Sequence, residues 1–379
     1  MNKIFPLFTV FHRLITVTAC LYLKCILLAV ILGMSATACC GEEKMPDSPQ
    51  GMNNDKQVFA KGADVSWLTE MESAGLKFYN ADGVPMECMA LLKSLGLDAI
   101  RLRVWVNPID GWCNKEDVLA KAKRAHDLGM RLMLDFHYSD VWADPASQYK
   151  PEAWKGLSLE QLTSAIALHT KDVLEALKEN SIMPEWVQVG NEVGPGMLWD
   201  SNVSLSGATY NVEKENGVVY AKNEANFAMF VTTGCRAVKQ VFPKAKVIVH
   251  LQEGGNNDLY RWIFDMLKKN NAEYDVIGMS LYPEIDTWDK MTNACIKNMA
   301  DMVARYDKDV MICEVGMSWD EAEVCKEFLV KLLKHSKTVD RCLGIFYWEP
   351  ESYGGWKGYT KGAFDNSGRA TEALDAFKQ

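Results

Sequence analysis

The sequence lacks the features that mark several large classes of proteins. Its 379 residues carry a formal net charge of −9, so no basic excess favours nucleic acid or an anionic membrane surface as a partner. No glycine-rich phosphate loop follows the first apolar run, and the chain contains neither an internal repeat nor a low-complexity segment. These absences argue against the commonest nucleotide-binding fold and against a repeat protein.

Zinc, disulfide and calcium patterns are missing as well. The seven cysteines beyond residue 57 form an odd, scattered set, which is a poor disulfide framework, and no pair has the spacing of a zinc site. We expect most of them to be small buried side chains, and the sequence leaves room for one or two disulfide bridges. No run of Asp and Asn has the density of oxygen ligands that calcium requires, so we predict no metal and no cofactor.

The first 57 residues differ from the rest of the chain. Residues 25–34 form an unbroken apolar run that is too short for an ordinary membrane-spanning helix, and small residues then lead to Cys39 and Cys40. We predict a lipoprotein-type signal peptide over residues 1–40, with Cys39 or Cys40 lipidated, and a polar tether over residues 41–57. The protein is then exported and lipid-anchored at the outer membrane or cell surface. The alternative is a plain signal of a periplasmic or secreted protein.

Residues 58–379 alternate between apolar, β-rich runs and helical patterns. Hydrophobic residues make up 48% of the chain, which supplies ample core for one large domain. Eight such runs and eight helical segments predict a single (β/α)8 barrel, with a doubly wound open sheet as the alternative. The predicted strands are residues 60–66, 99–105, 131–136, 186–191, 246–250, 276–281, 310–314 and 344–348. The predicted helices are residues 86–94, 115–128, 159–180, 223–241, 258–270, 289–305, 320–335 and 370–377.

Two of the predicted strands end in a glutamate and are followed by glycine-containing loops. The fourth ends in Asn191-Glu192 and the seventh in Glu314. A carboxylate at the end of a buried strand is costly unless it has a partner or a function. Because barrel enzymes carry their catalytic residues at the carboxyl ends of the strands, we expect the two side chains to approach each other across the barrel mouth.

Two carboxylates across a cleft can cleave an acetal, one as an ionised nucleophile and the other as a proton donor to the leaving oxygen. In that chemistry Asn191 would bond the hydroxyl beside the reacting carbon, Tyr282 would hold the nucleophile, and Trp348 would stack on a sugar ring. The predicted substrate-binding residues are Asp64, Arg101, Arg103, His137, Asn191, His250, Tyr282 and Trp348. Further tryptophans at or just beyond strand ends are candidates for stacking: Trp105, Trp142, Trp199, Trp319 and Trp356.

For several of these residues a structural role remains open. Arg101 and Arg103 lie two apart and share one face of a strand, where they would either favour the charged nucleophile or form buried ion pairs with acidic neighbours such as Asp64. His137 and His250 would equally serve as satisfied polar residues, and the tryptophans as core residues.

Five segments resemble the arabinogalactan endo-β-1,4-galactanases, glycoside hydrolase family 53, in the clan of retaining (β/α)8 glycosidases. They are residues 62–66 (Gly-Ala-Asp-Val-Ser), 101–108 (Arg-Leu-Arg-Val-Trp-Val-Asn-Pro), 135–140 (Asp-Phe-His-Tyr-Ser-Asp), 188–192 (Gln-Val-Gly-Asn-Glu) and 347–350 (Tyr-Trp-Glu-Pro). The resemblance implies that Glu192 is the acid/base, Glu314 the nucleophile and β-1,4-galactan the substrate. Some bacterial members carry calcium in a long loop after the last strand. Here residues 351–365 are short of acidic groups, so calcium is not carried over.

The sequence thus predicts a retaining endo-glycosidase that cleaves internal bonds of β-1,4-galactan by double displacement. One alternative is a related barrel glycosidase that acts on mannan or glucan. The other is a catalytically silent glycan-binding protein of the cell surface. Both glutamates are present, which favours an enzyme.

Overall fold

The computed structural model describes residues 58–379, except for residue 202 and residues 204–215. The predicted signal peptide, the lipidation at Cys39 or Cys40 and the tether fall on residues 1–57 and lie outside the described residues. In the part of the chain that is described, no helix combines the length and the apolar character needed to cross a bilayer.

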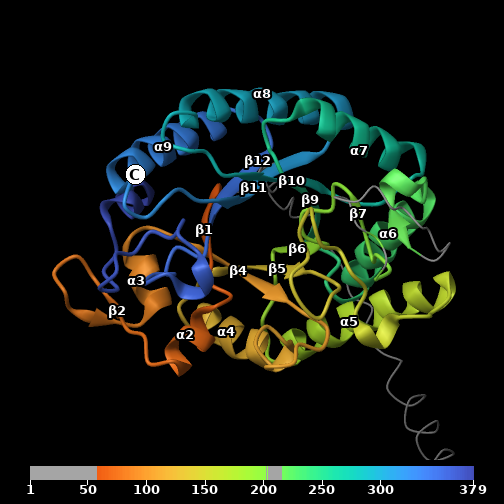
Figure 1. Cartoon of the computed structure of the whole chain (residues 1–379), viewed down its shortest axis with the longest axis horizontal. Helices are drawn as coiled ribbons and strands as arrows, with labels where there is room; N and C mark the ends of the chain where they lie inside the picture. The colour runs from red at the N-terminus through yellow and green to blue at the C-terminus, as the bar shows by residue number, and fades with distance from the viewer. Residues whose placement is uncertain (1–57, 202, 204–215) are drawn as a thin grey trace, which may run out of the picture. The chain divides into compact units, whose positions relative to one another are not determined.

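Eight parallel strands close into a barrel, in which each strand is hydrogen-bonded to the barrel strands that precede and follow it in the chain (Figure 1). The closed ring β1-β12-β11-β10-β9-β6-β5-β4 confirms the predicted (β/α)8 fold and excludes the open sheet. The barrel strands are β1 (Ala60–Asp64), β4 (Ala99–Val104), β5 (Arg131–Phe136), β6 (Trp186–Val189), β9 (Lys246–Leu251), β10 (Val276–Leu281), β11 (Asp309–Val315) and β12 (Cys342–Trp348).

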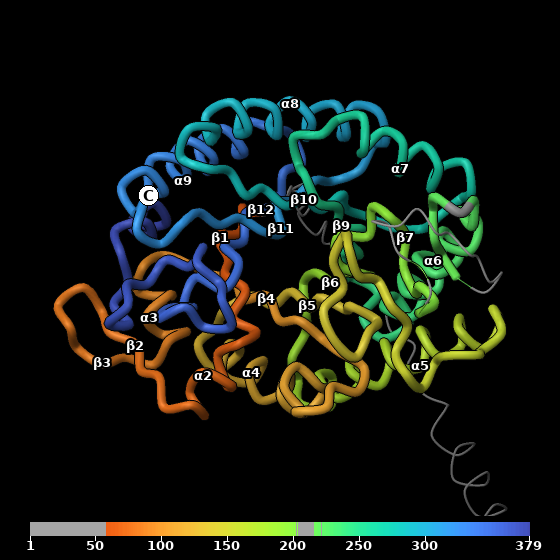
Figure 2. The backbone as a smooth tube through the Cα atoms, in the orientation of Figure 1, coloured from red at the N-terminus to blue at the C-terminus, as the bar shows by residue number. Residues whose placement is uncertain are grey.

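Helices lie outside the strands and connect them (Figures 1 and 2). Several begin at polar residues whose side chains cap the helix: the side chain of Ser158 accepts a hydrogen bond from the Gln161 amide, in a capping box, and Asn114 and Asn256 cap in the same sense. The helices are α3 (Cys88–Ser94), α4 (Lys115–Asp127), α5 (Leu159–Glu179), α6 (Glu224–Val241), α7 (Asn257–Lys269), α8 (Trp288–Tyr306) and α9 (Ala322–Ser336).

The prediction of an ordinary helix over residues 370–377 was wrong in the type of helix. The chain there forms the 3-10 helix η4 (Glu372–Lys378), which begins with the bond from the Leu374 amide to the Thr371 carbonyl, 3.3 Å. Its buried Leu374 and Phe377 pack on α9. Short segments at chain ends often take this tighter winding, and packing rather than helical propensity decides it here.

The sequence analysis gave no bounds for the short elements within the loops. None of these elements shows the apolar periodicity of a barrel strand or helix, because each is only two to six residues long. They are the helix α2 (Leu68–Ser73), the pairs β2 (Phe78–Tyr79) with β3 (Pro85–Met86) and β7 (Gly196–Met197) with β8 (Gly217–Val218), and the 3-10 turns η1 (Glu152–Trp154), η2 (Val219–Ala221) and η3 (Trp356–Gly358).

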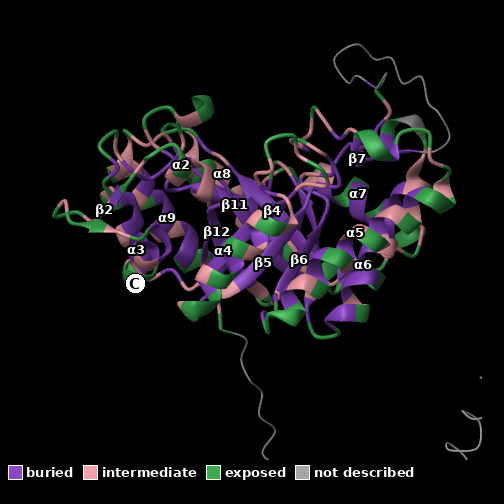
Figure 3. Cartoon of the chain, turned by 90° about the horizontal axis from the view of Figure 1, so that it is seen from below, coloured by how far each residue is buried: buried purple, intermediate pink, exposed green. Residues whose placement is uncertain are grey.

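The side chains inside the barrel change from apolar to polar along the barrel axis. Apolar side chains, among them Met133, Trp186 and Ile248, form one buried cluster of strand residues. Because side chains two apart share a strand face, the residues that follow them on the same face are Asp135, Gln188 and His250, all buried and polar. A larger apolar cluster joins strands and helices, and Figure 3 shows that most residues of the barrel strands are buried. The seven cysteines among the described residues are free.

Candidate active site

A cleft of about 490 Å³ opens at the carboxyl ends of the strands. Glu192 and Glu314 both line it, as the sequence predicted. Four of the predicted substrate-binding residues line it as well: His137, Asn191, Tyr282 and Trp348. Further residues of the wall, which were absent from that predicted set, are Trp67, Trp142, Asp144, Lys357, Tyr359 and Lys361.

Glu192 is placed by a sharp turn directly after β6. Its φ is 45° and that of Gly190 is 86°, so the backbone passes twice through the left-handed region. Such angles are uncommon for a residue other than glycine and cluster at functional sites. The Gln148 side chain holds the turn by donating a hydrogen bond to the Asn191 carbonyl, 2.7 Å.

Glu314 is placed by an irregularity in β11. Met311 and Cys313 both belong to the interior apolar cluster, so strict alternation would direct Glu314 away from the interior, towards the helices. The register against β10 shifts by one residue between Ile312 and Glu314, which makes Cys313 the extra residue of a β-bulge. A bulge redirects the side chain that follows it, and Glu314 consequently lines the cleft.

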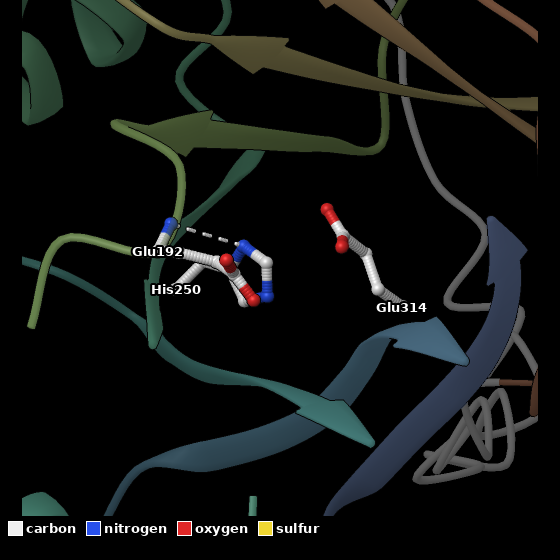
Figure 4. Close-up of side chains that lie close together, drawn as sticks. All are labelled: Glu192, His250 and Glu314. Atoms are coloured by element: carbon white, nitrogen blue, oxygen red, sulfur yellow. Dashed lines mark hydrogen bonds between the residues drawn. The ribbon is translucent and has the colours of Figure 1, made fainter. Parts of the chain in front are cut away.

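The two glutamates face each other across the barrel mouth (Figure 4). One carboxylate oxygen of each, together with one ring nitrogen of His250, lie within 4.8 Å of one another. A separation of no more than 4.8 Å between these oxygens agrees with the short ~5–5.5 Å spacing of retaining glycosidases and is below the ~6.5–9.5 Å that leaves room for a water in inverting ones. The pair is therefore suited to direct attack by one carboxylate.

Glu314 is held by two donors. Arg101 Nη2 lies 2.8 Å from its Oε1, and the Tyr282 hydroxyl donates a hydrogen bond of 2.8 Å to its Oε2. Burial raises the pKa of Glu314 to about 7, while Arg101 and then Tyr282 act to lower it. The same guanidinium is paired with two fully buried carboxylates, Asp64 at 2.6 Å and Asp135 at 2.9 Å, which fix its position.

Glu192 has the opposite electrostatic environment. Burial and next the negative charge of Glu314 raise the pKa of Glu192 to about 8, and a hydrogen bond from Ser280 only partly offsets this. Two carboxylates this close cannot easily both ionise, so the pair tends to hold one proton. Because Arg101 and Tyr282 stabilise negative charge on Glu314, we place the single proton of the pair on Glu192.

The two histidines lie in satisfied hydrogen-bond networks. His137 Nδ1 accepts from the Ala143 amide at 3.0 Å, so its Nε2 is the donor to Asp135, 2.9 Å away. His250 has Nδ1 3.0 Å from Asn191 Oδ1 and Nε2 2.8 Å from Ser280 Oγ. Burial lowers the pKa of both rings, so both are neutral near pH 7.

Among the described residues, Glu192, His250 and Glu314 form the one cluster whose spacing would suit a metal ion. Both ring nitrogens of His250 are already engaged, and the Arg101 guanidinium lies against Glu314. A cation there would have to displace these contacts and sit beside a fixed positive charge. The donor set therefore fits acid–base chemistry better than metal binding.

Four predicted substrate-binding residues lie beneath the cleft rather than in its wall: Asp64, Arg101, Arg103 and His250. The two arginines form buried ion pairs, which was one of the two roles that the sequence left open: Arg101 pairs with Asp64, and the Nη1 of Arg103 lies 3.1 Å from Glu349. These contacts position neighbouring groups. Direct contact of the four with a substrate stays a prediction.

A second pair of buried carboxyl groups lies under the aromatic wall. Glu349 directly follows β12 with φ 46°, and its side chain lies close enough to that of Glu351 for their charges to interact. Both are fully buried, and neither carboxylate oxygen of Glu351 has a hydrogen-bond partner among the described residues. Burial raises the pKa of Glu349 to about 7 and that of Glu351 well above its usual range. Because two neighbouring buried carboxyl groups do not easily both ionise, the pair tends to hold one proton.

The fold and the facing glutamates define a glycoside hydrolase of the (β/α)8 barrel type. The chain belongs to glycosyl hydrolase family 53, whose profile matches residues 60–377. It is 30% identical over 361 residues to an arabinogalactan endo-β-1,4-galactanase of Cellvibrio japonicus, covering 85% of this chain and 90% of that protein. It is also 30% identical over 313 residues to arabinogalactan endo-β-1,4-galactanase A of Aspergillus niger, covering 76% and 84%.

Solved structures show the same barrel. A fungal β-1,4-galactanase superposes with a TM-score of 0.75 at 27% identity, covering 85% of this chain and 100% of the other. The family 53 catalytic domain of Ignisphaera aggregans gives a TM-score of 0.72 at 29% identity, covering 84% and 95%.

Proposed function

We propose that the protein is a retaining endo-β-1,4-galactanase in which Glu192 is the acid/base and Glu314 the nucleophile. The observation that carries this assignment is the asymmetric pair at the barrel mouth. Its oxygens lie within 4.8 Å, and only Glu314 has both a guanidinium and a phenol donating to its carboxylate.

In the first step a Glu314 oxygen attacks the anomeric carbon of a galactosyl unit while Glu192 gives its proton to the departing glycosidic oxygen. The C–O bond to the leaving sugar breaks as the ester to Glu314 forms. In the second step Glu192 takes a proton from water, the resulting hydroxide adds to the same carbon, and Glu314 leaves as a carboxylate. Two inversions leave the anomeric configuration unchanged.

Support for galactan as the substrate comes from the names of the family relatives and from the chemistry of the ring. Galactose and glucose differ in one hydroxyl, axial or equatorial at carbon four. A site built to bond the axial hydroxyl leaves polar groups unpaired when glucose binds, which discriminates strongly. The aromatic wall, with Trp67, Trp142 and Trp348, offers flat apolar faces for a chain of such rings.

Initial rates on unbranched β-1,4-galactan, mannan and cellulose test the proposal. We expect internal cleavage of galactan to short galacto-oligosaccharides and little action on the other two, with Glu192→Gln as the inactive control. Faster cleavage of mannan or cellulose would identify that polymer, rather than galactan, as the substrate. Binding without cleavage of any of the three would favour a glycan-binding protein.

We further propose that the protein is exported and anchored by a lipid at Cys39 or Cys40. Support comes from the apolar run at residues 25–34, the small residues after it and the polar tether at residues 41–57. A polysaccharide too large to cross a membrane is best cleaved outside the cell.

A further inference from the structure

A second, smaller hollow lies beside the catalytic cleft, next to the carboxyl end of β4. Its volume is about 180 Å³, below the ~300–1,000 Å³ of a typical ligand pocket, so it suits one ring rather than a whole chain. We call it the outer hollow. Trp67, Trp142 and Lys357 line both spaces, so the outer hollow is a lateral extension of the cleft.

An unbroken series of indole rings connects the two spaces. Trp105, in the outer hollow, packs edge to face on Trp142 with 5.3 Å between ring centroids. Trp142 packs in the same way on Trp67, at 5.6 Å, and Trp67 on Trp348 of the cleft, at 5.2 Å. A glycan that lies against Trp348 thus meets the same kind of surface as it continues outward.

The rings at the boundary are fixed from beneath. The guanidinium carbon of Arg103 lies 4.0 Å from the centroid of Trp142 and 4.9 Å from that of Trp105, and Glu349 holds the same guanidinium from the other side. A buried cation over an indole face is a favourable contact. Rings that are already ordered lose little conformational entropy when a ligand stacks on them.

Trp112 also lines the outer hollow and is half-buried. Its loop is closed by a hydrogen bond from the Trp105 amide to the Cys113 carbonyl, 2.8 Å, and Asp117 accepts from the Cys113 amide, 2.7 Å. These bonds hold the loop that carries Trp112 at the hollow, although Trp112 lies outside any helix or strand.

Both cations of the outer hollow are engaged in ion pairs. Glu70 pairs with Lys357 at 2.6 Å, and Arg103 pairs with Glu349. Two further carboxylates line the hollow: Asp140 accepts from the Asn107 and Glu152 amides, and Asp110 is exposed at the rim, where it can accept hydrogen bonds from hydroxyl groups. Aromatic walls with paired cations and carboxylate acceptors favour a neutral, polyhydroxylated ring over an anion.

We infer that the outer hollow is a further glycan subsite, which takes a pyranose unit of the polysaccharide chain beyond the units held next to Glu192 and Glu314. Trp112 is part of its wall. The inference rests on the proposed function, since it assumes that a β-1,4-glycan occupies the cleft.

The test is the dependence of kcat/KM on chain length, measured with a trisaccharide and a heptasaccharide of β-1,4-galactose. In Trp112→Ala we expect the advantage of the heptasaccharide over the trisaccharide to shrink about tenfold, which corresponds to about 1.4 kcal/mol. Trp112→Phe, which keeps a flat ring, should retain most of the advantage. Trp262→Ala removes a 40% exposed tryptophan on α7 that lines neither the cleft nor the outer hollow, and it should leave the advantage of the heptasaccharide unchanged.

An equal loss on both oligosaccharides would show that Trp112 only supports the fold, and no loss on either would also overturn the subsite. If the wild-type protein does not hydrolyse the galactose series, the proposed galactanase function fails by itself. The same ratio, measured on the mannose or glucose series that is hydrolysed, then decides the subsite. Hydrolysis of none of the three overturns both.

Discussion

Replacing Tyr282 by phenylalanine removes one hydroxyl and leaves the ring in place. That hydroxyl donates a 2.8 Å hydrogen bond to Oε2 of Glu314, and nothing in this contact depends on the substrate. A hydrogen bond to a charged group contributes ~1.5–3 kcal/mol. At 1.36 kcal/mol per unit, its loss should raise the pKa of Glu314 by about 1–2 units.

The direction of the effect on activity follows from the role of Glu314. The nucleophile must be ionised, so kcat/KM rises with pH as Glu314 loses its proton. This rise forms the acidic limb of the pH–kcat/KM profile, and a higher pKa of Glu314 moves the limb to higher pH. Below the new limb, kcat/KM should fall by roughly 10–100-fold, since each unit of pKa is worth tenfold in the ionised fraction. The alkaline limb, which we assign to Glu192, should move much less.

The assay is a pH–kcat/KM profile on an aryl β-galactobioside for the wild-type protein and Tyr282→Phe. Tyr353→Phe is a matched control, because the Tyr353 hydroxyl donates a 2.9 Å bond to the Lys77 carbonyl, away from the cleft. The reasoning is refuted if the acidic limb of Tyr282→Phe coincides with that of the wild type, or if only the alkaline limb moves.

Three further predictions follow from the same contacts and from the sequence. Glu351→Gln should flatten the loss of thermal stability as pH rises above about 5: the folded-state pKa of Glu351 is raised, so its protonated form stabilises the fold at low pH and this contribution is lost as pH rises through that pKa. Melting temperatures across this range test it, and an unchanged slope counts against the shared proton. Activity should survive EDTA, because the Glu314 carboxylate is engaged by Arg101 and Tyr282; loss that calcium restores would reveal a metal site. Mass spectrometry of the mature N-terminus should find a lipid on Cys39 or Cys40, and an unmodified terminus would favour simple secretion.

The barrel could be predicted because its strands and helices are long enough to show their own periodicity. The two glutamates of the cleft could be singled out for a related reason, since a carboxylate at the end of an apolar run stands out against the cost of burying it. The predicted helix starts at Lys115 and Leu159 are those of α4 and α5, where the side chains of Asn114 and Ser158 cap the helices.

What the sequence could not show depends on contacts between distant segments. The bulge at Cys313 that turns Glu314 into the cleft leaves no mark in the sequence pattern, because Cys313 is apolar like the three strand residues before it. Which tryptophans face the cleft was likewise hidden: Trp142 and Trp348 line it, whereas Trp199 is fully buried. Trp67 and Tyr359 reach the cleft from loops whose paths only packing determines.

The most direct test of the central claim is the stereochemistry of azide rescue in Glu314→Ala and Glu192→Ala. With an activated aryl β-galactobioside, azide takes the place of Glu314 and attacks the β-glycoside itself, so Glu314→Ala should give the α-glycosyl azide. In Glu192→Ala the ester to Glu314 still forms and azide then attacks it, so the product should be the β-glycosyl azide. NMR of the two products decides the matter. Exchanged configurations, or wild-type activity in either variant without azide, would contradict the assignment of Glu314 as nucleophile and Glu192 as acid/base.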